Sequence, residues 1–426
     1  MVTKHLQFPC VLVGLWAAGC TEPAPQEGSD QGSFVEDLFD EIPNNVNFPN
    51  AFGFAATYST AGYVDLNNAF FTPQGSNGRH CGTCHSPEIG WTMSPQMVTT
   101  LFLLTAGTHP LFANNLDTDT PTADMSTAEA RWNATTMLRQ GKFTRKIALP
   151  ATRDYDLVSF TDPFGITTPA TLFFFRRPMP TANLRSFNVH WDNQQTVGTD
   201  LHAGLMKQAR GNILNAQQGP TPLDAVLDGI ATYESALTSA QTYIFGVGSL
   251  TAGGAHGGPE YAASQPLVAG RFDLYDAWQS SPISKRQQIW RGQEIFNNVN
   301  APSGKRCNGC HNIANNGGNL NGALINIGAS SPALAKPDMA VFTFQSRVTG
   351  AIVETTDPGA GARNGNFSDL NKFKVPSLRG LVARAPYFHG GSADTLEDVV
   401  QHYEDALGFV FTAQEEADLV AFLKAL

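Results

Sequence analysis

Apolar residues recur at helical spacing in several separate stretches of this chain. The clearest stretch covers residues 284–298, in which four large apolar residues lie on a helical period: Ile289, Trp290, Ile295 and Phe296. Residues 201–214 and 222–237 are the better helix candidates in the first half of the chain. We therefore predict a helix in each of these three ranges.

Near the C-terminal end, Thr412 is followed three residues later by Glu415, which makes a capping box, the signature of a helix start. An apolar stripe follows it, made of Leu419, Val420, Phe422, Leu423 and Leu426. Strand-like alternation is rare, and residues 171–175 are the candidate for a short paired strand. The pattern predicts a mainly α protein with long irregular loops, which the 40 glycines and 26 prolines favour.

The first residues of the chain are typical of an export signal. An apolar run covers residues 8–18, which is too short to span a bilayer but suits a signal-peptide core. Small residues precede Cys20, as in the lipobox of bacterial lipoproteins, although Ala17 stands where leucine is usual. We predict a lipoprotein-type signal peptide over residues 1–19, with an ordinary cleaved signal as the alternative, and a flexible tether over residues 20–48.

Either signal would export the mature protein to the periplasm of a bacterium. With the lipid anchor, it would be an outer-membrane lipoprotein that faces the periplasm or the exterior. Its only membrane contact would then be the acyl chains at Cys20.

Composition and charge narrow the range of functions. The chain has 426 residues, of which 42% are hydrophobic, and is therefore long enough for about two folded domains. Acidic residues (37) outnumber Lys and Arg (27), and no basic run is long enough to follow a phosphate backbone. We therefore expect no nucleic-acid partner.

Four of the six cysteines form two identical C-x-x-C-H frames. These are Cys81-Gly-Thr-Cys84-His85 and Cys307-Asn-Gly-Cys310-His311. A zinc site would need its second pair within about 20 residues, whereas these pairs lie in opposite halves of the chain, and a single redox dithiol would not explain the repeat. The frame is the one to which c-type haem is attached: two thiols bond to the vinyl groups, and the next residue binds the iron. We predict two covalently bound haems, with His85 and His311 as iron ligands.

The two frames also predict the domain organisation. We expect two cytochrome c-like domains, each with one haem, over residues 49–245 and 282–426. Residues 246–281 between them are rich in glycine and alanine at their start, and we interpret them as a linker or an excursion on the surface.

Several segments outside the haem frames carry further motifs. In the second half they are residues 356–359 (TDPG), 372–380 (KFKVPSLRG), 385–391 (APYFHGG) and 395–400 (TLEDVV). In the first half they are residues 177–180 (RPMP), 190–192 (HWD) and 208–211 (QARG). With the haem frames, this set resembles the bacterial di-haem cytochrome c peroxidases and their relative MauG. The resemblance covers nearly the whole mature chain and is strongest in its C-terminal half.

The resemblance implies a second axial ligand for the C-terminal iron on the helix after residues 385–391, usually a Met and in MauG-like members a Tyr. The matching position here is Tyr403, which would share a helical face with Leu396, Val400 and Leu407, whereas His402 would point about 100° away. We therefore prefer Tyr403 as the ligand. The alternatives are a buried Tyr beside the porphyrin edge, and His402 or Met339 as the ligand.

The resemblance makes the N-terminal iron the peroxide site. In ordinary family members a His closes this iron until reduction opens it, and the matching position here is Leu101. Met93, Met97 and His109 are lesser candidates for a ligand, because each is better explained by packing or by a loop. We expect an iron that is already open to peroxide.

The family moves the proton of bound peroxide with a Gln and a Glu. Gln208 matches the first of these residues, but the second position is Gln218, which cannot take a proton. Unless Asp192 or Asp224 substitutes for it, peroxide turnover should be slow.

Two more residues and a metal ion follow from the resemblance. Trp191 matches a tryptophan that carries electrons between the haems, with a core Trp as the alternative. His389 matches an interdomain histidine that orders the haem surroundings, with a purely structural His as the alternative. The family's interdomain calcium is doubtful here, because its Asn ligand position is Pro178.

Three functions fit these residues. The leading one is an exported di-haem oxidoreductase that reduces hydrogen peroxide to water at the N-terminal haem. A small soluble donor, such as a cytochrome c or a cupredoxin, would supply electrons through the C-terminal haem. The second is MauG-like oxidation of a protein or organic substrate, which ligation by Tyr403 would favour. The third is a non-enzymatic electron-transfer cytochrome, for which Gln218 argues. The oligomeric state stays open, a homodimer included.

Overall fold

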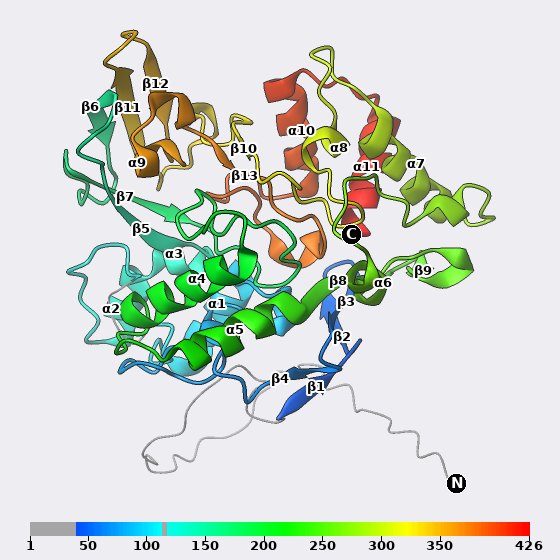
Figure 1. Cartoon of the computed structure of the whole chain (residues 1–426), viewed down its shortest axis with the longest axis horizontal. Coiled ribbons are helices and arrows are strands. Elements are labelled where there is room, and N and C mark those ends of the chain that lie inside the picture. Colours follow the sequence, from blue (N-terminus) through cyan, green and yellow to red (C-terminus); the bar gives the residue numbers. More distant parts are fainter. Residues whose placement is uncertain (1–39, 113–116) are drawn as a thin grey trace. The chain divides into compact units, whose positions relative to one another are not determined.

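Eleven α-helices and thirteen β-strands occur in the part of the chain that the structure, a computed structural model, describes, namely residues 40–112 and 117–426. The helices are α1 (Pro95–Thr105), α2 (Ala128–Ala134), α3 (Thr136–Arg139), α4 (Leu201–Asn215), α5 (Asp224–Ala236), α6 (Pro259–Ser264), α7 (Ser284–Asn298), α8 (Cys307–Cys310), α9 (Gly361–Asn364), α10 (Leu396–Leu407) and α11 (Ala413–Lys424). The strands are β1 (Glu41–Pro43), β2 (Asn47–Asn50), β3 (Gly53–Ser59), β4 (Tyr63–Asp65), β5 (Phe143–Ala148), β6 (Tyr155–Thr161), β7 (Thr171–Arg176), β8 (Leu237–Ile244), β9 (Gly248–Ser249), β10 (Leu324–Ile325), β11 (Val341–Ser346), β12 (Ile352–Thr355) and β13 (Phe373–Lys374) (Figure 1).

The start of the chain lies outside the described residues. This applies to the predicted signal peptide, to Cys20 and to residues 20–39 of the predicted tether. The last residues of that segment are described, and β1 and β2 already pair there with β4 and β3. Within the described ranges, no helix combines the length and the apolar character needed to cross a membrane.

The predicted helices are confirmed. Helix α7 has the predicted bounds, and α4 and α5 fall within a residue or two of theirs. Helix α11 begins after its capping box, in which the Thr412 hydroxyl accepts from the Glu415 N–H while the Glu415 carboxylate accepts from the Thr412 N–H. The predicted strand lies within β7, which pairs with β5.

The prediction of a mainly α fold is wrong. Of the described residues, 33% are helical and 18% are in strands, so the protein is a mixed α and β structure. The strands are short, but some show the alternation that a half-buried strand requires. In β7, for example, Leu172, Phe174 and Arg176 are buried and the residues between them are partly exposed. Some of the strands pair with partners far away along the chain, such as β3 with β8 and β6 with β11, so local patterns did not indicate these pairs.

All the strands pair antiparallel, in five small sheets. The largest has the order β2-β3-β8-β9, and a second has the order β12-β11-β6. The second sheet joins the two halves of the chain, because β6 precedes the predicted linker and β11 follows it: Tyr155 pairs with Ser346 and Thr161 with Val341. Figure 1 shows β6 beside β11 and β12.

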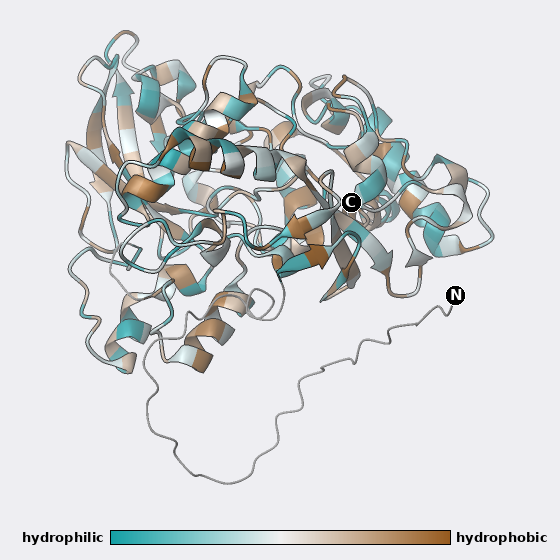
Figure 2. Ribbon diagram, turned by 60° about the horizontal axis from the view of Figure 1, so that its bottom comes forward, coloured by the Kyte–Doolittle hydropathy of each residue, from teal (hydrophilic) through white to brown (hydrophobic). Residues whose placement is uncertain are grey.

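A hydrophobic core surrounds the contact between α7 and α11. Gly292 makes this contact close, since a Cβ at this position would lie 1.9 Å from the Asp418 carbonyl oxygen. Figure 2 shows both hydrophobic and hydrophilic segments along single helices, as expected for helices with one buried face. The segment expected to be a linker contributes to this core five residues that are at most 1% exposed: Leu250, Phe272, Leu274, Tyr275 and Trp278.

Candidate functional site

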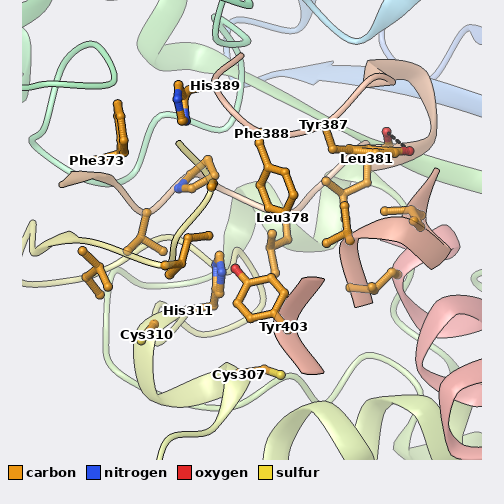
Figure 3. A pocket seen from close by; sticks show the side chains of 18 of the residues that line it. Cys307, Cys310, His311, Phe373, Leu378, Leu381, Tyr387, Phe388, His389 and Tyr403 are labelled. Carbon is orange, nitrogen blue, oxygen red and sulfur yellow. Dashed lines mark hydrogen bonds between the residues drawn. The ribbon is translucent and has the colours of Figure 1, made fainter. Parts of the chain in front are cut away.

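A cavity of about 410 Å³ lies beside the second C-x-x-C-H frame. Cys307 and Cys310 on α8 and the following His311 line it, and Tyr403 approaches from α10 (Figure 3). Most of the other walls are apolar side chains, among them Leu378 and Leu381. A cavity of this size and character is typical of a site for a large, mostly apolar cofactor.

His311 is held in an orientation that suits an iron ligand. Its Nδ1 hydrogen-bonds to the carbonyl oxygen of Gly317, which leaves Nε2 available to a metal ion. Burial lowers the pKa of His311 to about 4, so the ring is neutral at pH 7 and can offer a lone pair. Phe296 of α7 packs beside the ring and connects it to the core.

Tyr403 lies in this cavity, as its helical face predicted. Leu396, Val400, Tyr403 and Leu407 all line the cavity, and the capping box of Thr395 and Asp398 fixes where α10 begins. Burial raises the pKa of the Tyr403 phenol, so only a partner such as a metal ion would favour its ionised form. Tyr403 therefore lines the same cavity as His311, and its ligation of the iron stays a prediction.

The lesser candidates for this ligand lie elsewhere. His402 points away from the cavity, and its Nε2 lies 2.8 Å from the carbonyl oxygen of Ile327. Met339 lies in a separate small cleft with Asp338, next to His389.

The first frame repeats the arrangement of the second. The His85 Nδ1 lies 2.9 Å from the carbonyl oxygen of Trp91, and in both frames the accepting residue follows the histidine by six positions. Trp91 is fully buried and has a φ of 64°, a conformation that bulky residues rarely adopt. Burial lowers the pKa of His85 to about 4. His85 and His311 therefore share the same hydrogen bond to a backbone carbonyl and the same lowered pKa.

Both frames fit a c-type haem. In each, two cysteines lie beside a histidine whose Nδ1 is occupied by a carbonyl and whose Nε2 is available. At the second frame, an apolar cavity extends from these three residues. The thiols would bond to the vinyl groups, and the imidazoles would bind the iron.

The surroundings of the first frame are apolar. Cys81 packs in a cluster with Phe70, Phe71, Trp91 and Tyr233, whose rings lie 5.0–6.4 Å apart. On the other side, Cys84 packs in a cluster that contains Met93, Met97 and Leu101. The side chain at position 101 is therefore near the frame and cannot bind iron. The Nδ1 of His109 accepts a hydrogen bond from the Leu111 N–H.

The two predicted glutamines occupy different surroundings. Gln208 is partly exposed on α4, one residue before Ala209, which packs in the cluster of Cys81. Gln218 is exposed, with a φ of 56°, and its carbonyl oxygen accepts from the Ser76 hydroxyl. Its neighbour Gln217 is 1% exposed instead, and its amide nitrogen lies 4.0 Å from the Cys81 Sγ. The prediction missed Gln217, because nothing in the sequence distinguishes the two.

Glu234 is a buried carboxylic acid that the sequence did not indicate. It lies on α5 and is 2% exposed, and among the described residues no hydrogen-bond partner meets its Oε2. Burial raises its pKa to about 8. Burial is also the main cause that raises the pKa of Cys81, and the ionised form of Glu234 would raise it further. Glu234 is therefore a buried acid near Cys81, whereas Asp117, whose charge acts on Cys84, is paired with Arg79. The two acids considered in the sequence are engaged elsewhere: Asp192 in buried ion pairs and Asp224 in an exposed pair with Arg210.

Trp191 and His389 meet at the edge of the cavity beside the second frame, and both residues line it. The Trp191 Nε1 donates to the carbonyl oxygen of Arg177, and its ring meets that of His389 edge to face, with 6.3 Å between centroids. Phe373 stacks on the other face of His389, with 3.9 Å between centroids. The side chain of Trp191 is thus fixed by a hydrogen bond and a ring contact.

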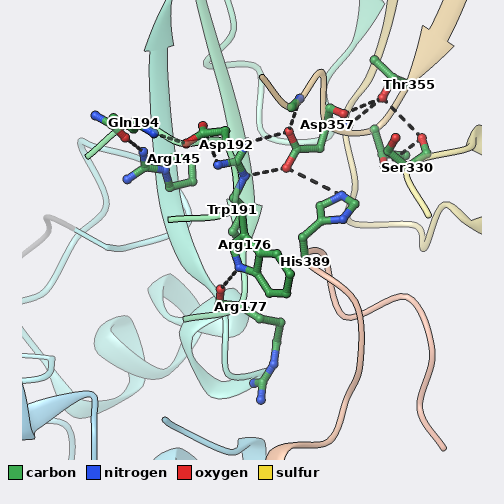
Figure 4. A network of polar contacts seen from close by, with 12 residues as sticks. Arg145, Arg176, Arg177, Trp191, Asp192, Gln194, Ser330, Thr355, Asp357 and His389 are labelled. Carbon is green, nitrogen blue, oxygen red and sulfur yellow. Dashed lines mark hydrogen bonds and ion pairs between the residues drawn. The ribbon is translucent and has the colours of Figure 1, made fainter. Parts of the chain in front are cut away.

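A buried network of ion pairs lies beside Trp191 and His389 (Figure 4). Arg176 donates from Nε and Nη2 to the two oxygens of Asp357, at 2.6 and 2.8 Å, and from Nη1 to Asp192 at 2.7 Å. The His389 Nε2 lies 3.7 Å from the same Asp357 carboxylate. Burial alone would raise the pKa of Asp357, but the charge of Arg176 outweighs it and holds that pKa below its usual value.

Pro178 stands at the ligand position of the calcium that the sequence made doubtful. The carbonyl oxygen of Pro178 accepts a hydrogen bond from the Thr92 hydroxyl at 3.0 Å. In the described ranges, no group of three or more His, Cys, Asp or Glu residues is arranged to hold a metal ion.

The comparisons with known proteins agree with the motifs. No family model matches the chain. A cytochrome c551 peroxidase of Nitrosomonas europaea is 45% identical over 76 residues, which are 17% of this chain and 23% of that protein. The cytochrome c peroxidase IdrP2 of Denitromonas iodatirespirans is 33% identical over 182 residues, 39% of this chain and 46% of that protein. The methylamine utilization protein MauG of Methylophilus methylotrophus is 36% identical over 83 residues, 16% of this chain and 25% of that protein.

This chain is a homologue of the bacterial cytochrome c peroxidases and MauG. The family resemblance predicted from the motifs is thereby confirmed. The matched stretches span less than half the length of each of these relatives. The activity, substrate and partners of this cytochrome c peroxidase homologue are therefore matters of proposal.

Proposed function

We propose that this homologue is an exported oxidoreductase with two covalently bound c-type haems, which reduces hydrogen peroxide to water at the N-terminal haem. The observation that carries the proposal is the cavity beside the second frame. It brings Cys307, Cys310, His311, Tyr403 and Trp191 to one site. The names of the relatives support peroxide as the substrate and a cytochrome as the donor.

When bound, each haem supplies a one-electron redox centre, and an iron with a free axial position supplies a binding site for peroxide. The protein's contribution begins with His85 and His311, which burial keeps neutral and which the carbonyls of Trp91 and Gly317 orient. Leu101, in the cluster of Cys84, offers no ligand to the first iron. The first site would therefore accept peroxide without prior opening.

The proton chemistry of the first site would rest on residues other than Gln218, which is exposed. Glu234 is buried near Cys81 and is protonated at pH 7, because burial raises its pKa to about 8. It can therefore hold a proton in an otherwise apolar cluster. Trp191, which Arg177 and His389 hold in place, would pass electrons out of the cavity beside the second frame.

A second function is favoured by one observation, the presence of Tyr403 in the cavity. A tyrosine ligand stabilises ferric iron, unlike the thioether that usually makes this site a store of electrons. With Tyr403 holding the C-terminal haem, that haem would supply oxidising power toward a protein or an organic substrate, as in MauG-like members.

Two measurements test these functions. Mass spectrometry of the exported protein should show two haems, one on each frame, and a mature N-terminus that is acylated at Cys20 if the lipoprotein prediction holds. Adding one equivalent of hydrogen peroxide to the fully ferric protein should change its absorption spectrum at once. A protein that stays inert in both the ferric and the half-reduced state would contradict peroxide chemistry and favour an electron carrier.

Tyr403→Phe tests which of the two functions applies. Loss of the phenol oxygen should change the absorption spectrum of one haem and leave the other unchanged. If both haem spectra match those of the wild type, Tyr403 is not a ligand and the MauG-like alternative loses its support.

A further inference from the structure

Three buried cations line the cavity of the second frame: Lys374, Arg177 and Arg384, which we call the cationic wall. They are 8%, 3% and 9% exposed. The Lys374 Nζ donates to the carbonyl oxygen of Asn188 at 2.6 Å. The two guanidinium groups likewise donate to backbone carbonyls, among them those of Gly141 and Gly380. All three charges therefore end on neutral oxygen atoms.

Outside the cavity, most of the buried cations among the described residues pair with carboxylates, and Arg379, which donates to the Gly258 carbonyl oxygen, is the exception. Arg176 binds Asp357 and Asp192, and Lys142 binds Asp338 at 3.0 Å. Among the described residues, no carboxylate lies within ion-pair distance of any member of the cationic wall. Burying an unpaired charge is costly, and a neutral carbonyl recovers only part of that cost. The cationic wall therefore indicates an anion that the cavity holds.

The position of the wall identifies the kind of anion. Figure 3 shows Cys307 and Cys310 at one end of the cavity, and Phe373 and His389 at the other. Lys374 follows Phe373 in β13, and the Arg177 N–H donates to the carbonyl oxygen of His389 at 2.7 Å. A c-type haem carries its two carboxylate side chains on the edge opposite the vinyl groups that bond to cysteine. Its anionic edge would thus lie at the end of the cavity that carries Lys374 and Arg177.

We propose that the cationic wall binds the two carboxylates of the C-terminal haem and directs that edge of the haem toward Trp191. Trp191 lies between the two anchoring residues: the Lys374 N–H donates to its carbonyl oxygen at 2.8 Å, and its Nε1 donates to the Arg177 carbonyl oxygen at 2.9 Å. The inference rests on the proposed haem of the second frame. Burial lowers the pKa of Lys374 to about 8, and a carboxylate beside it would oppose that shift.

The reduction potential of the C-terminal haem tests the inference. In the haem-loaded protein, Lys374→Met should lower the midpoint potential of one haem, because loss of a nearby positive charge favours ferric iron. Lys374→Gln should lower it similarly, although glutamine can still donate a hydrogen bond. The matched control is Lys372→Met, which removes a half-exposed lysine paired with Asp369 and should shift neither potential. Unchanged potentials in both Lys374 variants, or a shift with methionine alone, would overturn the inference.

A second measurement uses the wild-type protein, in case the variants do not fold. With haem labelled with ¹³C at its carboxyl carbons, the infrared difference spectrum on reduction should show only ionised carboxylates at neutral pH for the C-terminal haem. A protonated carboxyl band from this haem would contradict binding to the cationic wall. Mass spectrometry distinguishes failure of the proposed cofactor from failure of this inference. An empty second frame would refute the proposed cofactor. A loaded frame with unchanged potentials would refute only the binding of the haem carboxylates by the cationic wall.

Discussion

The Asp357→Asn variant tests how much the buried network stabilises the protein. Arg176 and Asp357 are 1% and 2% exposed, and two charge-assisted hydrogen bonds join them. Asparagine keeps the shape of the side chain but removes its charge and replaces one accepting oxygen with a donor. Arg176 would then retain a single carboxylate partner, Asp192.

The expected loss follows from this geometry. Removing one partner of a buried ion pair costs about 3–5 kcal/mol, because the remaining charge stays buried. That loss would raise the equilibrium constant for unfolding by roughly two to four orders of magnitude. The change also removes the carboxylate next to His389, so the ring loses a neighbour that favours its protonated form.

Chemical denaturation followed by circular dichroism measures this loss. The matched control is Asp156→Asn, because Asp156 also receives two hydrogen bonds from one arginine, Arg347, but both side chains are about half exposed. A pair in that position should contribute less than about 1 kcal/mol. Equal losses in the two variants would refute the argument from burial.

The dependence on pH gives a second check. Since Arg176 holds the pKa of Asp357 below its usual value, the stabilisation by Asp357 is fully present above the unfolded pKa of about 3.9. It is lost as the pH falls through the lower folded value. The difference in stability between wild type and Asp357→Asn should therefore be constant near neutral pH and shrink in acid. A difference that grows in acid would contradict this sign.

Two further predictions concern packing and a buried acid. Gly292→Ala should destabilise the protein by about 1–3 kcal/mol or more in a denaturant titration, because the new methyl group meets the Asp418 carbonyl. Its control, Gly229→Ala, has no atom within 4 Å of the new Cβ and should stabilise the protein by up to about 1 kcal/mol. Similar losses in both would show that close packing is not the cause. Glu234 has a raised pKa of about 8, so its burial costs more as the pH rises from about 4.5 to 8. Glu234→Gln should therefore gain stability over the wild type across this range in a pH series of unfolding curves, and a gain that shrinks would contradict the assignment.

Local signals predicted the parts of the structure that depend on neighbouring residues. Helix α7 and the capping box of α11 each depend on a short stretch of sequence, and both are confirmed. The family resemblance pointed to Tyr403, and helical geometry supported the choice by placing Tyr403 and His402 on different faces of the helix. The hydrogen bonds that orient His85 and His311 are local as well, since each histidine bonds to the carbonyl oxygen of the residue six positions further along.

Long-range contacts could not be predicted in the same way. The pairing of β6 with β11 joins residues on opposite sides of residues 246–281, so no local pattern indicates it. The burial of Glu234 and Lys374 is equally invisible, because in sequence both look like ordinary charged surface residues. Gln217 and Gln218 are adjacent and identical, and only the backbone turn at Gln218 decides which one is buried near Cys81.

The sheet that β6 shares with β11 and β12 means that the halves of the chain cannot be treated as separable modules. If the gene were divided within residues 246–281, the N-terminal fragment would carry β6 without its partner, with Val158 and Phe160 already exposed on that strand. The C-terminal fragment would carry a β11–β12 hairpin in which β11 has lost its partner β6. Unpaired edges recruit other strands, so each fragment alone should aggregate. Fragments made together should instead reassemble, with β6 and β11 as the joint.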